Sequence, residues 1–333
     1  MKVLALHEAN GPASARIEDA AIPAPQAGEV RVALRAASFN HRELWIARGQ
    51  YPGMKLPCVL GADGAGVIDA VGEGVDPGQI GRSVVLYPGL GWGNDERFPD
   101  KSFGLLGMPG PGTMAEFICV PAASACAKPE YLSFEEAAAF PTGALTAFRA
   151  LTVKAGLQPG ENILITGIGG GVASFALQFA CAMGANVFVT SSSDATNARA
   201  VAMGAKIGFN YRDDAWRKDL AKASGGIDVV FDGAPASAYA GYQRALRFGA
   251  RVVMYGSTGG AQVPVSAPDL FLRHATILGT AMGSPRDFQA MLDFATQHQI
   301  HPVIDRGFPL AQADEALLYV ESGHQFGKVT VTI

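Results

Sequence analysis

The stretch ENILITGIGGGVASFALQFACAMGANVFVTSSS, residues 161–193, decides the fold class. It opens with a short apolar run, passes through a glycine-rich turn into a longer apolar segment, and closes with a second apolar run. Short apolar runs bounded by glycine are typical of buried strands, and buried strands that alternate with helices form a parallel, doubly wound sheet. The stretch therefore predicts an α/β fold built on such a sheet.

The glycine-rich turn carries the first functional signal. Gly167 ends the predicted strand, and the helix then opens without side chains at Gly169, Gly170 and Gly171. Backbone N–H groups at such a helix start can hold a pyrophosphate, assisted by the helix dipole. Val172 stands where a strict G-x-G-x-x-G motif has its last glycine. A glycine-rich turn is often only a turn, but a buried strand before it and a long helix after it favour dinucleotide binding.

The end of the second strand indicates which dinucleotide binds. The strand ends in three serines, Ser191, Ser192 and Ser193. A site that prefers NAD usually has an acidic side chain at this point, whereas serines leave room for a 2′-phosphate and offer it hydroxyl donors. Arg199 or Arg212 could supply the positive charge, and a serine that caps the next helix is compatible with this role. We therefore predict NADP, bound as NADPH.

Composition limits the function classes. The 333 residues are 49% hydrophobic and 17% charged, and this length favours two domains. A net charge of −4 gives no reason to expect nucleic acid or an anionic membrane as partner. The N-terminus resembles no signal peptide, and no apolar run reaches membrane-spanning length. We expect a cytoplasmic protein that acts on a small molecule, with reduced thiols at Cys58, Cys119, Cys126 and Cys181.

The pattern of the chain changes near residue 125. Before that point it reads as short strands broken by glycine and proline, which indicates a mostly-β domain. From about residue 133 strands alternate with helices, including one predicted over SAYAGYQRALRFG, residues 237–249. The closing FGKVTVTI, residues 326–333, is a strand that could return to the first domain. We therefore expect one domain from residues 1–125 and 265–333 and a dinucleotide-binding domain from residues 126–264.

Several motifs together resemble the medium-chain dehydrogenases/reductases, and specifically their zinc-independent quinone oxidoreductase-like branch. The resemblance covers the whole length and rests on the glycine-rich stretch and on AASFNHRELWIARGQYP (36–52), LPCVLGADGAGVIDAVGEGV (56–75), GTMAEFICVPA (112–122), FPTGALTAFRAL (140–151) and FGKVTV (326–331). It implies a GroES-like catalytic domain around a Rossmann-type domain, NAD(P)H-dependent chemistry, and homodimers or homotetramers.

The resemblance also bears on zinc. Zinc-dependent relatives place a Cys where Asn40 stands, a His-Glu pair where Ala62 and Asp63 stand, and a third ligand near Thr142. Catalytic zinc needs three protein ligands, which these residue types do not supply. The four-cysteine lobe of those relatives is missing too, since residues 90–110 contain no cysteine. We therefore predict no metal site.

The resemblance implies roles for single residues. Asn40 and Tyr51 match residues of the catalytic cleft, and Thr146 matches a threonine near the nicotinamide. Tyr211 matches a tyrosine at the cofactor phosphate, and Gly256 and Ser257 are further candidate cofactor contacts. The lysine that commonly grips the 2′-phosphate is replaced by Thr196, which makes Arg199 more important. We expect Asp63 to pair with a buried base such as Arg48, and Glu43 to pair at a helix start.

The sequence thus favours an NADPH-dependent reductase of quinones or α,β-unsaturated carbonyl compounds. An alcohol or aldehyde dehydrogenase is a second possibility, and a cofactor-binding regulatory or structural protein is a third. Residues 89–112 and 265–285 are expected to shape the substrate pocket, but they contain no pattern that names the substrate.

Overall fold

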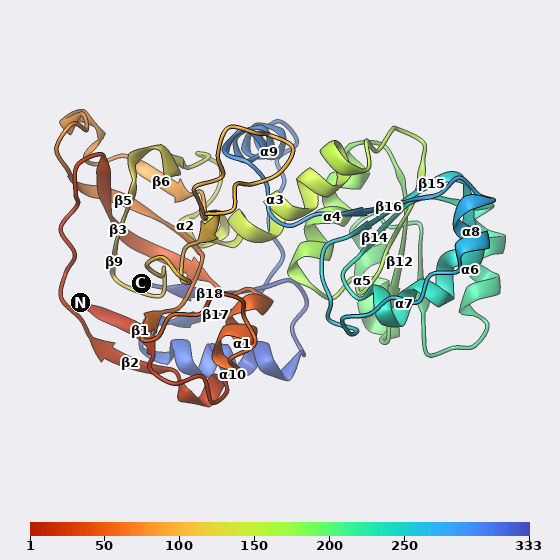
Figure 1. Ribbon diagram of the computed structural model, residues 1–333, viewed down its shortest axis with the longest axis horizontal. Coiled ribbons are helices and arrows are strands. Elements are labelled where there is room, and N and C mark those ends of the chain that lie inside the picture. The colour runs from red at the N-terminus through yellow and green to blue at the C-terminus, as the bar shows by residue number, and fades with distance from the viewer. The chain divides into compact units, whose positions relative to one another are not determined.

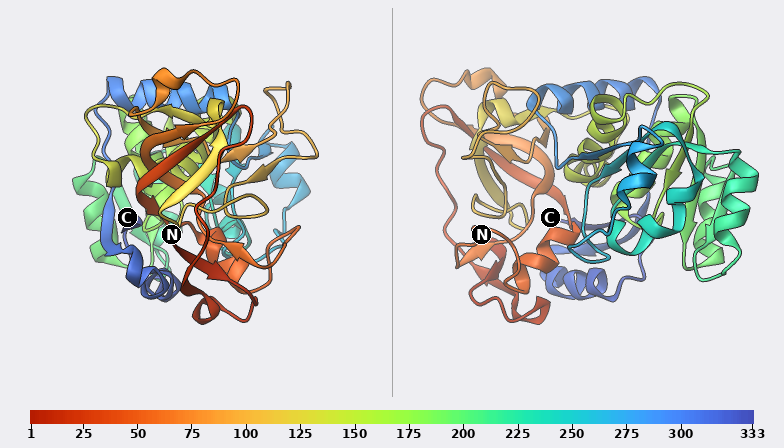
Figure 2. Two further views of the ribbon diagram at one scale, coloured as in Figure 1. Left: turned by 90° about the vertical axis from the view of Figure 1, so that its left-hand side faces the viewer. Right: turned by 45° about the vertical axis from the view of Figure 1, so that its right-hand side comes forward.

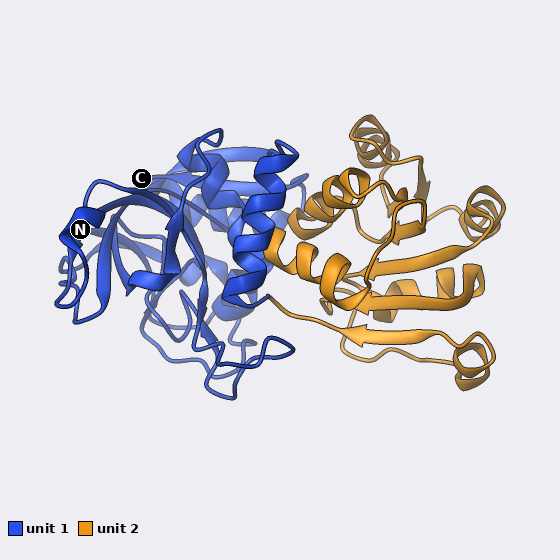
Figure 3. Cartoon of the chain, turned by 90° about the horizontal axis from the view of Figure 1, so that it is seen from above, with its two compact units in different colours: residues 1–143, 283–333 blue, residues 144–282 orange.

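The computed structural model describes residues 1–333 and divides them into two compact units (Figure 3). Unit 1 comprises Met1–Gly143 and Gly283–Ile333, and unit 2 comprises Ala144–Met282. The sequence pattern predicted the two domain boundaries earlier in the chain, at about residues 125 and 265. They fall later because helix α2 (Phe134–Ala139) packs against the sheet of unit 1, while strand β16 (Thr276–Gly279) pairs within the sheet of unit 2.

The strands of unit 1 pair antiparallel except for β17 and β18, which run parallel (Figure 2). A three-stranded sheet has the order β2 (Arg16–Asp19), β1 (Lys2–Leu6), β4 (Cys58–Val59). The main sheet has the order β10 (Ala125–Ala127), β6 (Ser83–Leu86), β5 (Asp63–Val71), β3 (Glu29–Ser38), β18 (Lys328–Thr332), β17 (Ile304–Pro309), and β9 (Phe117–Pro121) also pairs with β3. A short ribbon joins β7 (Gly89–Leu90) and β8 (Gly104–Leu105), and the helices are α1 (His41–Ala47), α2, α9 (Pro285–Gln297) and α10 (Ala313–Ser322).

The C-terminal strand completes this sheet. Strand β18 lies between β3 and β17, antiparallel to the first and parallel to the second. Val329 and Val331 point into an apolar core shared with α1 and α10, which explains why the chain returns here. Lys328, at the first position of the strand, is nevertheless only 3% exposed.

Unit 2 contains a six-stranded parallel sheet with helices on both faces (Figure 1). Its order is β13 (Ile207–Asn210), β12 (Asn186–Ser191), β11 (Asn162–Ile165), β14 (Ile227–Asp232), β15 (Leu246–Met254), β16. Helices α4 (Gly171–Ala182) and α5 (Asp194–Ala202) contact β11, β12 and β13, while α6 (Trp216–Ser224) and α7 (Pro235–Tyr242) bury aromatic side chains on the opposite face. The short α8 (Ala267–Phe271) precedes β16. The predicted fold class is confirmed.

One helix is shorter than the sequence predicted. The helix expected over residues 237–249 ends at Tyr242 as α7, and β15 begins at Leu246. Leu246 pairs with Ile227 of β14, and a register shift follows before the ladder resumes at Arg251. Pairing with a neighbouring strand therefore overrides the helical spacing of this segment. None of the helices combines the length and the apolar character needed to span a membrane.

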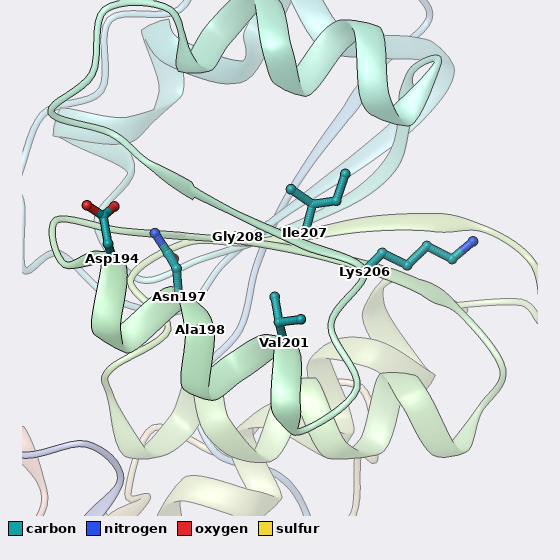
Figure 4. A pocket seen from close by; sticks show the side chains of 7 residues that line it. All are labelled: Asp194, Asn197, Ala198, Val201, Lys206, Ile207 and Gly208. Carbon is teal, nitrogen blue, oxygen red and sulfur yellow. The ribbon is translucent and has the colours of Figure 1, made fainter.

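A buried amide lies between α5 and the edge strand β13. Asn197 is 5% exposed, and neither its Oδ1 nor its Nδ2 has a hydrogen-bond partner. Its side chain lies against Gly208, where an added Cβ would come within 2.6 Å of the Asn197 Cβ. Figure 4 shows Asn197 beside a surface hollow of about 420 Å³ between this helix and strand. A buried polar group without partners destabilises the fold, because it has lost its hydrogen bonds to water.

Replacement of Asn197 by leucine is therefore expected to raise the free energy of unfolding by about 1–3 kcal/mol. Leucine has a similar size and brings no polar atoms, and the adjoining hollow can accept small adjustments. Urea unfolding followed by circular dichroism measures the effect. Ala198→Leu, at the exposed next position of the same helix, is the matched control and should change little. A loss of stability in Asn197→Leu would contradict the prediction.

Candidate functional site

The glycine turn of unit 2 fits a pyrophosphate. Gly167 follows β11 with φ of +62°, in the left-handed region that favours glycine, and a Cβ added there would meet nothing within 4 Å. Gly170 is the N-cap of α4 and supplies no side-chain cap, so side chains do not occupy the first N–H groups of the helix. These groups and the dipole of the twelve-residue helix are available to an anion. The remaining predicted residues, Gly169, Gly171 and Val172, lie in the same turn and first helical position.

The serines at the end of β12 lie at the same edge of the sheet as the glycine turn, where the parallel strands end. Ser191 is its last residue, and the Ser191 Oγ accepts from the N–H of Ser193 at 3.2 Å. The Ser193 Oγ caps α5 through the N–H of Thr196 at 3.3 Å. Both oxygens accept locally, which leaves the hydroxyl hydrogens free to be donated to a ligand. The half-exposed Ser192 lies between them.

The predicted partners of these serines lie at different places. Tyr211 is 49% exposed, and its N–H donates to the Ser191 carbonyl oxygen at 3.0 Å. Arg212 follows it, two residues after the end of β13, and is exposed. Arg199 lies in the last turn of α5, away from the N-terminal end that adjoins Ser191. The topology thus gives Arg212 the more direct access to the end of β12.

A buried acid, which sequence reasoning missed, joins the ends of two central strands. Asp232, the last residue of β14, is fully buried and accepts from the Thr166 hydroxyl at 2.6 Å and from the Tyr242 hydroxyl at 2.7 Å. Burial and the nearby Asp232 charge raise the pKa of Tyr242, so its hydroxyl remains a donor. Gly256 lies close to Gly233, the residue after Asp232, since a Cβ on Gly256 would come within 2.9 Å of the Gly233 carbonyl oxygen. Ser257 follows it and is exposed.

Unit 1 holds a polar cluster around Asp63, a fully buried residue at the start of β5. The Asp63 Oδ1 accepts from the N–H and the hydroxyl of Thr142, at 2.9 and 2.5 Å. Its Oδ2 accepts from the Asn40 Nδ2 at 2.8 Å, from the Lys328 Nζ at 3.1 Å and from the Ser38 hydroxyl at 3.3 Å. The carboxylate is therefore surrounded by donors on both oxygens.

Asn40 joins this cluster to a second one. Its backbone N–H donates to the Glu43 Oε2 at 2.7 Å, which is half of a capping box at the start of α1. Glu43 is fully buried, and its Oε1 accepts from the Arg42 guanidinium at 3.0 Å. Arg42 also donates to the Leu106 carbonyl oxygen at 2.9 Å, and its guanidinium lies over the Tyr51 ring, 4.9 Å from the centroid. The Arg42 guanidinium thus packs against one face of the Tyr51 ring.

Thr146 is the third predicted catalytic residue. It is 6% exposed and lies in helix α3 (Pro141–Arg149), four residues after Thr142. Residues with this spacing lie on the same face of a helix. The face that presents Thr142 to Asp63 therefore also carries Thr146, one turn further along.

One expectation needs correction. The base that pairs with Asp63 is Lys328, whereas Arg48 pairs with Glu321 near the surface at 2.8 Å. Glu43 pairs at a helix start as expected, and it does so in the interior. The one sequence signal for Lys328 was a lysine that opens a terminal strand in which no other residue is charged.

The glycine turn at the start of α4 and the doubly wound sheet are typical of a nucleotide-binding fold, and comparison with known proteins identifies the family. Residues 26–130 match the family described as alcohol dehydrogenase GroES-like domain, and residues 171–297 match the zinc-binding dehydrogenase family. The chain is 35% identical to the zinc-type alcohol dehydrogenase-like protein YogA of Leptosphaeria maculans, over 93% of this chain and 92% of that one. It belongs to the medium-chain dehydrogenase/reductase superfamily, as its motifs indicated.

Two further similarities show the range of activities among the relatives. A crystal structure named NAD-dependent alcohol dehydrogenase superimposes with a TM-score of 0.95 at 36% identity and covers 100% of both chains. The quinone oxidoreductase of Rattus norvegicus is 26% identical over 100% of this chain and 98% of its own. The protein is accordingly an oxidoreductase that uses a nicotinamide cofactor.

The residues of unit 1 do not fit a catalytic zinc ion, although one matched family is named for zinc. The positions that correspond to zinc ligands hold the amide of Asn40, the methyl group of Ala62 and the hydroxyl of Thr142. Asp63 is the one possible ligand among them, and its oxygens accept from the donors described above. No group of three or more His, Cys, Asp or Glu side chains comes together in the chain. The donor set thus lacks the nitrogen and sulfur ligands that zinc prefers.

The Arg42–Glu43 pair gives a prediction with a defined pH dependence. Burial raises the pKa of Glu43, and the Arg42 charge opposes this rise. Arg42→Met should cost about 3–5 kcal/mol of unfolding free energy at pH 8, because the Glu43 carboxylate is left buried without its cation. The pKa of Glu43 then rises further, so the folded variant binds a proton that the unfolded chain releases. Stability of the variant is therefore kept at low pH and lost as the pH rises through the raised pKa.

Urea unfolding at pH 6 and pH 8 measures this difference. The double variant Arg42→Met with Glu43→Gln should recover most of the loss and show no such pH dependence, because glutamine keeps the cap without a charge. An equal loss at both pH values in Arg42→Met would show that the carboxylate is not responsible.

Proposed function

We propose that the protein is an NADPH-dependent reductase that transfers hydride to quinones or α,β-unsaturated carbonyl compounds without a metal. The observation that supports this most directly is the Asp63 cluster. Where zinc-dependent relatives hold their metal, this chain has an amide, a hydroxyl and a carboxylate that accepts hydrogen bonds from Thr142, Ser38, Asn40 and Lys328. Such a site offers donors to a substrate oxygen and no Lewis acid.

The proposed chemistry follows from where charge develops. The reduced nicotinamide supplies the hydride, and its arrival at a quinone or enone drives negative charge onto a carbonyl oxygen. Preorganised donors stabilise that charge more than they stabilise the neutral ground state. Asn40 and Tyr51 are the proposed donors, since an amide and a phenol both donate without changing protonation at neutral pH. Arg42 and Glu43 hold these two residues in place through the contacts described above.

Alcohol oxidation is the second candidate, and the cluster counts against it. Loss of hydride from an alcohol also requires a base that removes the hydroxyl proton. Asp63 and Glu43 are the carboxylates next to Asn40, but both are fully buried and their oxygens accept from donors within the protein. Without zinc to acidify the alcohol, the barrier to this reaction is expected to be high. A purely regulatory or structural role would predict cofactor binding with no turnover of any substrate.

The preference for NADPH rests on the end of β12. Ser191 places no negative charge there, and an acid at this point would repel a 2′-phosphate. Asp194, in the first turn of α5, accepts from the Asn210 amide at 2.9 Å and is thereby drawn toward β13. We propose that Ser191, Ser192 and Tyr211 contact the phosphate region and that Arg212 supplies the charge, with Arg199 as the alternative. The Gly167 turn would hold the pyrophosphate, and Gly256 and Ser257 would line the nicotinamide side.

Arg212→Ala is expected to weaken NADPH binding about 10–100-fold, or roughly 1.5–3 kcal/mol, and to leave NADH binding nearly unchanged. Fluorescence titration with each cofactor measures both affinities. Arg199→Ala is the matched control, because it removes the same charge from the far end of α5, and it should have the smaller effect. A larger effect in Arg199→Ala would transfer the role to that residue. Tighter binding of NADH than of NADPH by the wild type would refute the assignment.

The wild type should reduce ortho- or para-quinones or enones with NADPH and oxidise simple alcohols hardly at all. Asn40→Ala should lower kcat about 10–1000-fold while cofactor affinity stays nearly intact, because a donor to the oxyanion acts mainly in the transition state. Steady-state kinetics and a separate NADPH titration test this, and dialysis against a chelator should leave the activity unchanged. Vigorous, chelator-sensitive ethanol oxidation would reject the proposed reaction class.

The family resemblance also leads us to propose a homodimer or homotetramer. Strand β16 has a neighbour on one side only, and Phe248, Phe271 and Leu272 are exposed in the segments around it. An open strand edge near exposed apolar side chains favours pairing with another chain. Light scattering in solution is expected to give a mass of two or four chains, and a monomer at micromolar concentration would contradict this. We propose a cytoplasmic location, which suits the four free cysteines.

A further inference from the structure

Lys328 is the cation of the Asp63 cluster. Its side chain is 3% exposed, and its Nζ donates to the Asn40 Oδ1 at 2.6 Å and to the Asp63 Oδ2 at 3.1 Å. The Asn40 Nδ2 in turn donates to the same Asp63 oxygen at 2.8 Å. Ammonium, amide and carboxylate therefore form a closed triangle inside unit 1.

This triangle determines which way the Asn40 amide faces. An ammonium can only donate and an ionised carboxylate can only accept, so the amide oxygen must face Lys328 and the amide nitrogen must face Asp63. One of the two Nδ2 hydrogens is used by Asp63, and the other remains available. A hydrogen bond from a cation to the amide oxygen also polarises the amide and strengthens its N–H groups as donors.

We propose that Lys328 is a positioning residue for the reaction: it holds and polarises Asn40 so that the second Nδ2 hydrogen is presented to the substrate oxygen. This inference rests on the proposed function, in which Asn40 is that donor. The ammonium acts through the amide and does not itself touch the substrate. The cluster thus contains a built-in cation, the ammonium group of Lys328.

Stability alone does not account for the pair. A buried ion pair is often no more stabilising than apolar residues of the same volume. A purely structural Lys328 would need only Asp63 as its partner. The shorter of its two contacts is instead with the neutral amide of Asn40.

A double-mutant cycle tests the proposal. Lys328→Met preserves the length of the side chain and removes the charge, and it is made in the wild type and in Asn40→Ala. With a quinone as substrate, Lys328→Met should lower kcat about 10–100-fold in the wild type and less than about twofold in Asn40→Ala, since the residue through which it acts is gone. NADPH affinity should stay within about twofold throughout.

The outcomes separate positioning from a structural role. An equal loss of kcat in both backgrounds, or no loss in the wild type, would overturn the proposal. Should Lys328→Met fold poorly because Asp63 is left unpaired, Lys328→Met with Asp63→Asn removes both charges and should fold with the same loss of kcat. A folded double variant with wild-type kcat would also overturn it.

A spectroscopic readout keeps the proposal separate from the proposed function. In protein labelled with ¹⁵N-asparagine, the Asn40 side-chain signal is identified by its absence from Asn40→Ala. It should move in Lys328→Met, because the amide loses its cationic neighbour, and an unmoved signal would show that Lys328 does not orient Asn40. Wild-type protein that reduces no quinone or enone would reject the proposed function. The shift of the Asn40 signal in Lys328→Met would still show whether Lys328 contacts the Asn40 amide.

Discussion

The burial of the Asp63 carboxylate is the constraint on which unit 1 depends. An ionised carboxylate removed from water costs several kcal/mol unless donors and a counter-charge replace its hydration. The replacements come from Ser38 at the end of β3, from the N-cap of α1, from the start of α3 and from the first residue of β18. One side chain thus requires four segments of the chain to meet at one point.

The dinucleotide-binding unit could be predicted because its information is local. A strand, a turn without side chains and a helix follow one another within residues 161–182, and each has a pattern that can be read in sequence. The N-cap of α1 could also be anticipated, since Asn40 and Glu43 stand at the spacing of a capping box. The helix expected over residues 237–249 was partly wrong because its second half pairs with β14, a partner that helical spacing does not reveal.

The Asp63 cluster could not be predicted in the same way. Asp63 and Lys328 are separated by 265 positions, and no periodicity connects them. Arg48 was the nearer and more usual choice of base, but its position on α1 directs it to Glu321. Lys328 and not Arg48 reaches Asp63 because β18 pairs with β3, which in turn pairs with β5. The absence of zinc ligands was readable from residue types, whereas the cation near their positions was not.

The insertion of β18 between β3 and β17 affects how the protein is made. The segment that supplies Lys328 is synthesised after the whole of unit 2, whereas Asp63 and Asn40 are synthesised before it. Unit 2 is one uninterrupted stretch, so its sheet can form while the main sheet of unit 1 still lacks β17 and β18. Until β18 is synthesised, the end of β3 that pairs with it has no partner on that side, next to an acid that has not yet met its base. Synthesis from the N-terminus thus makes the acid and the amide of the Asp63 cluster before the cofactor domain, and their cation after it.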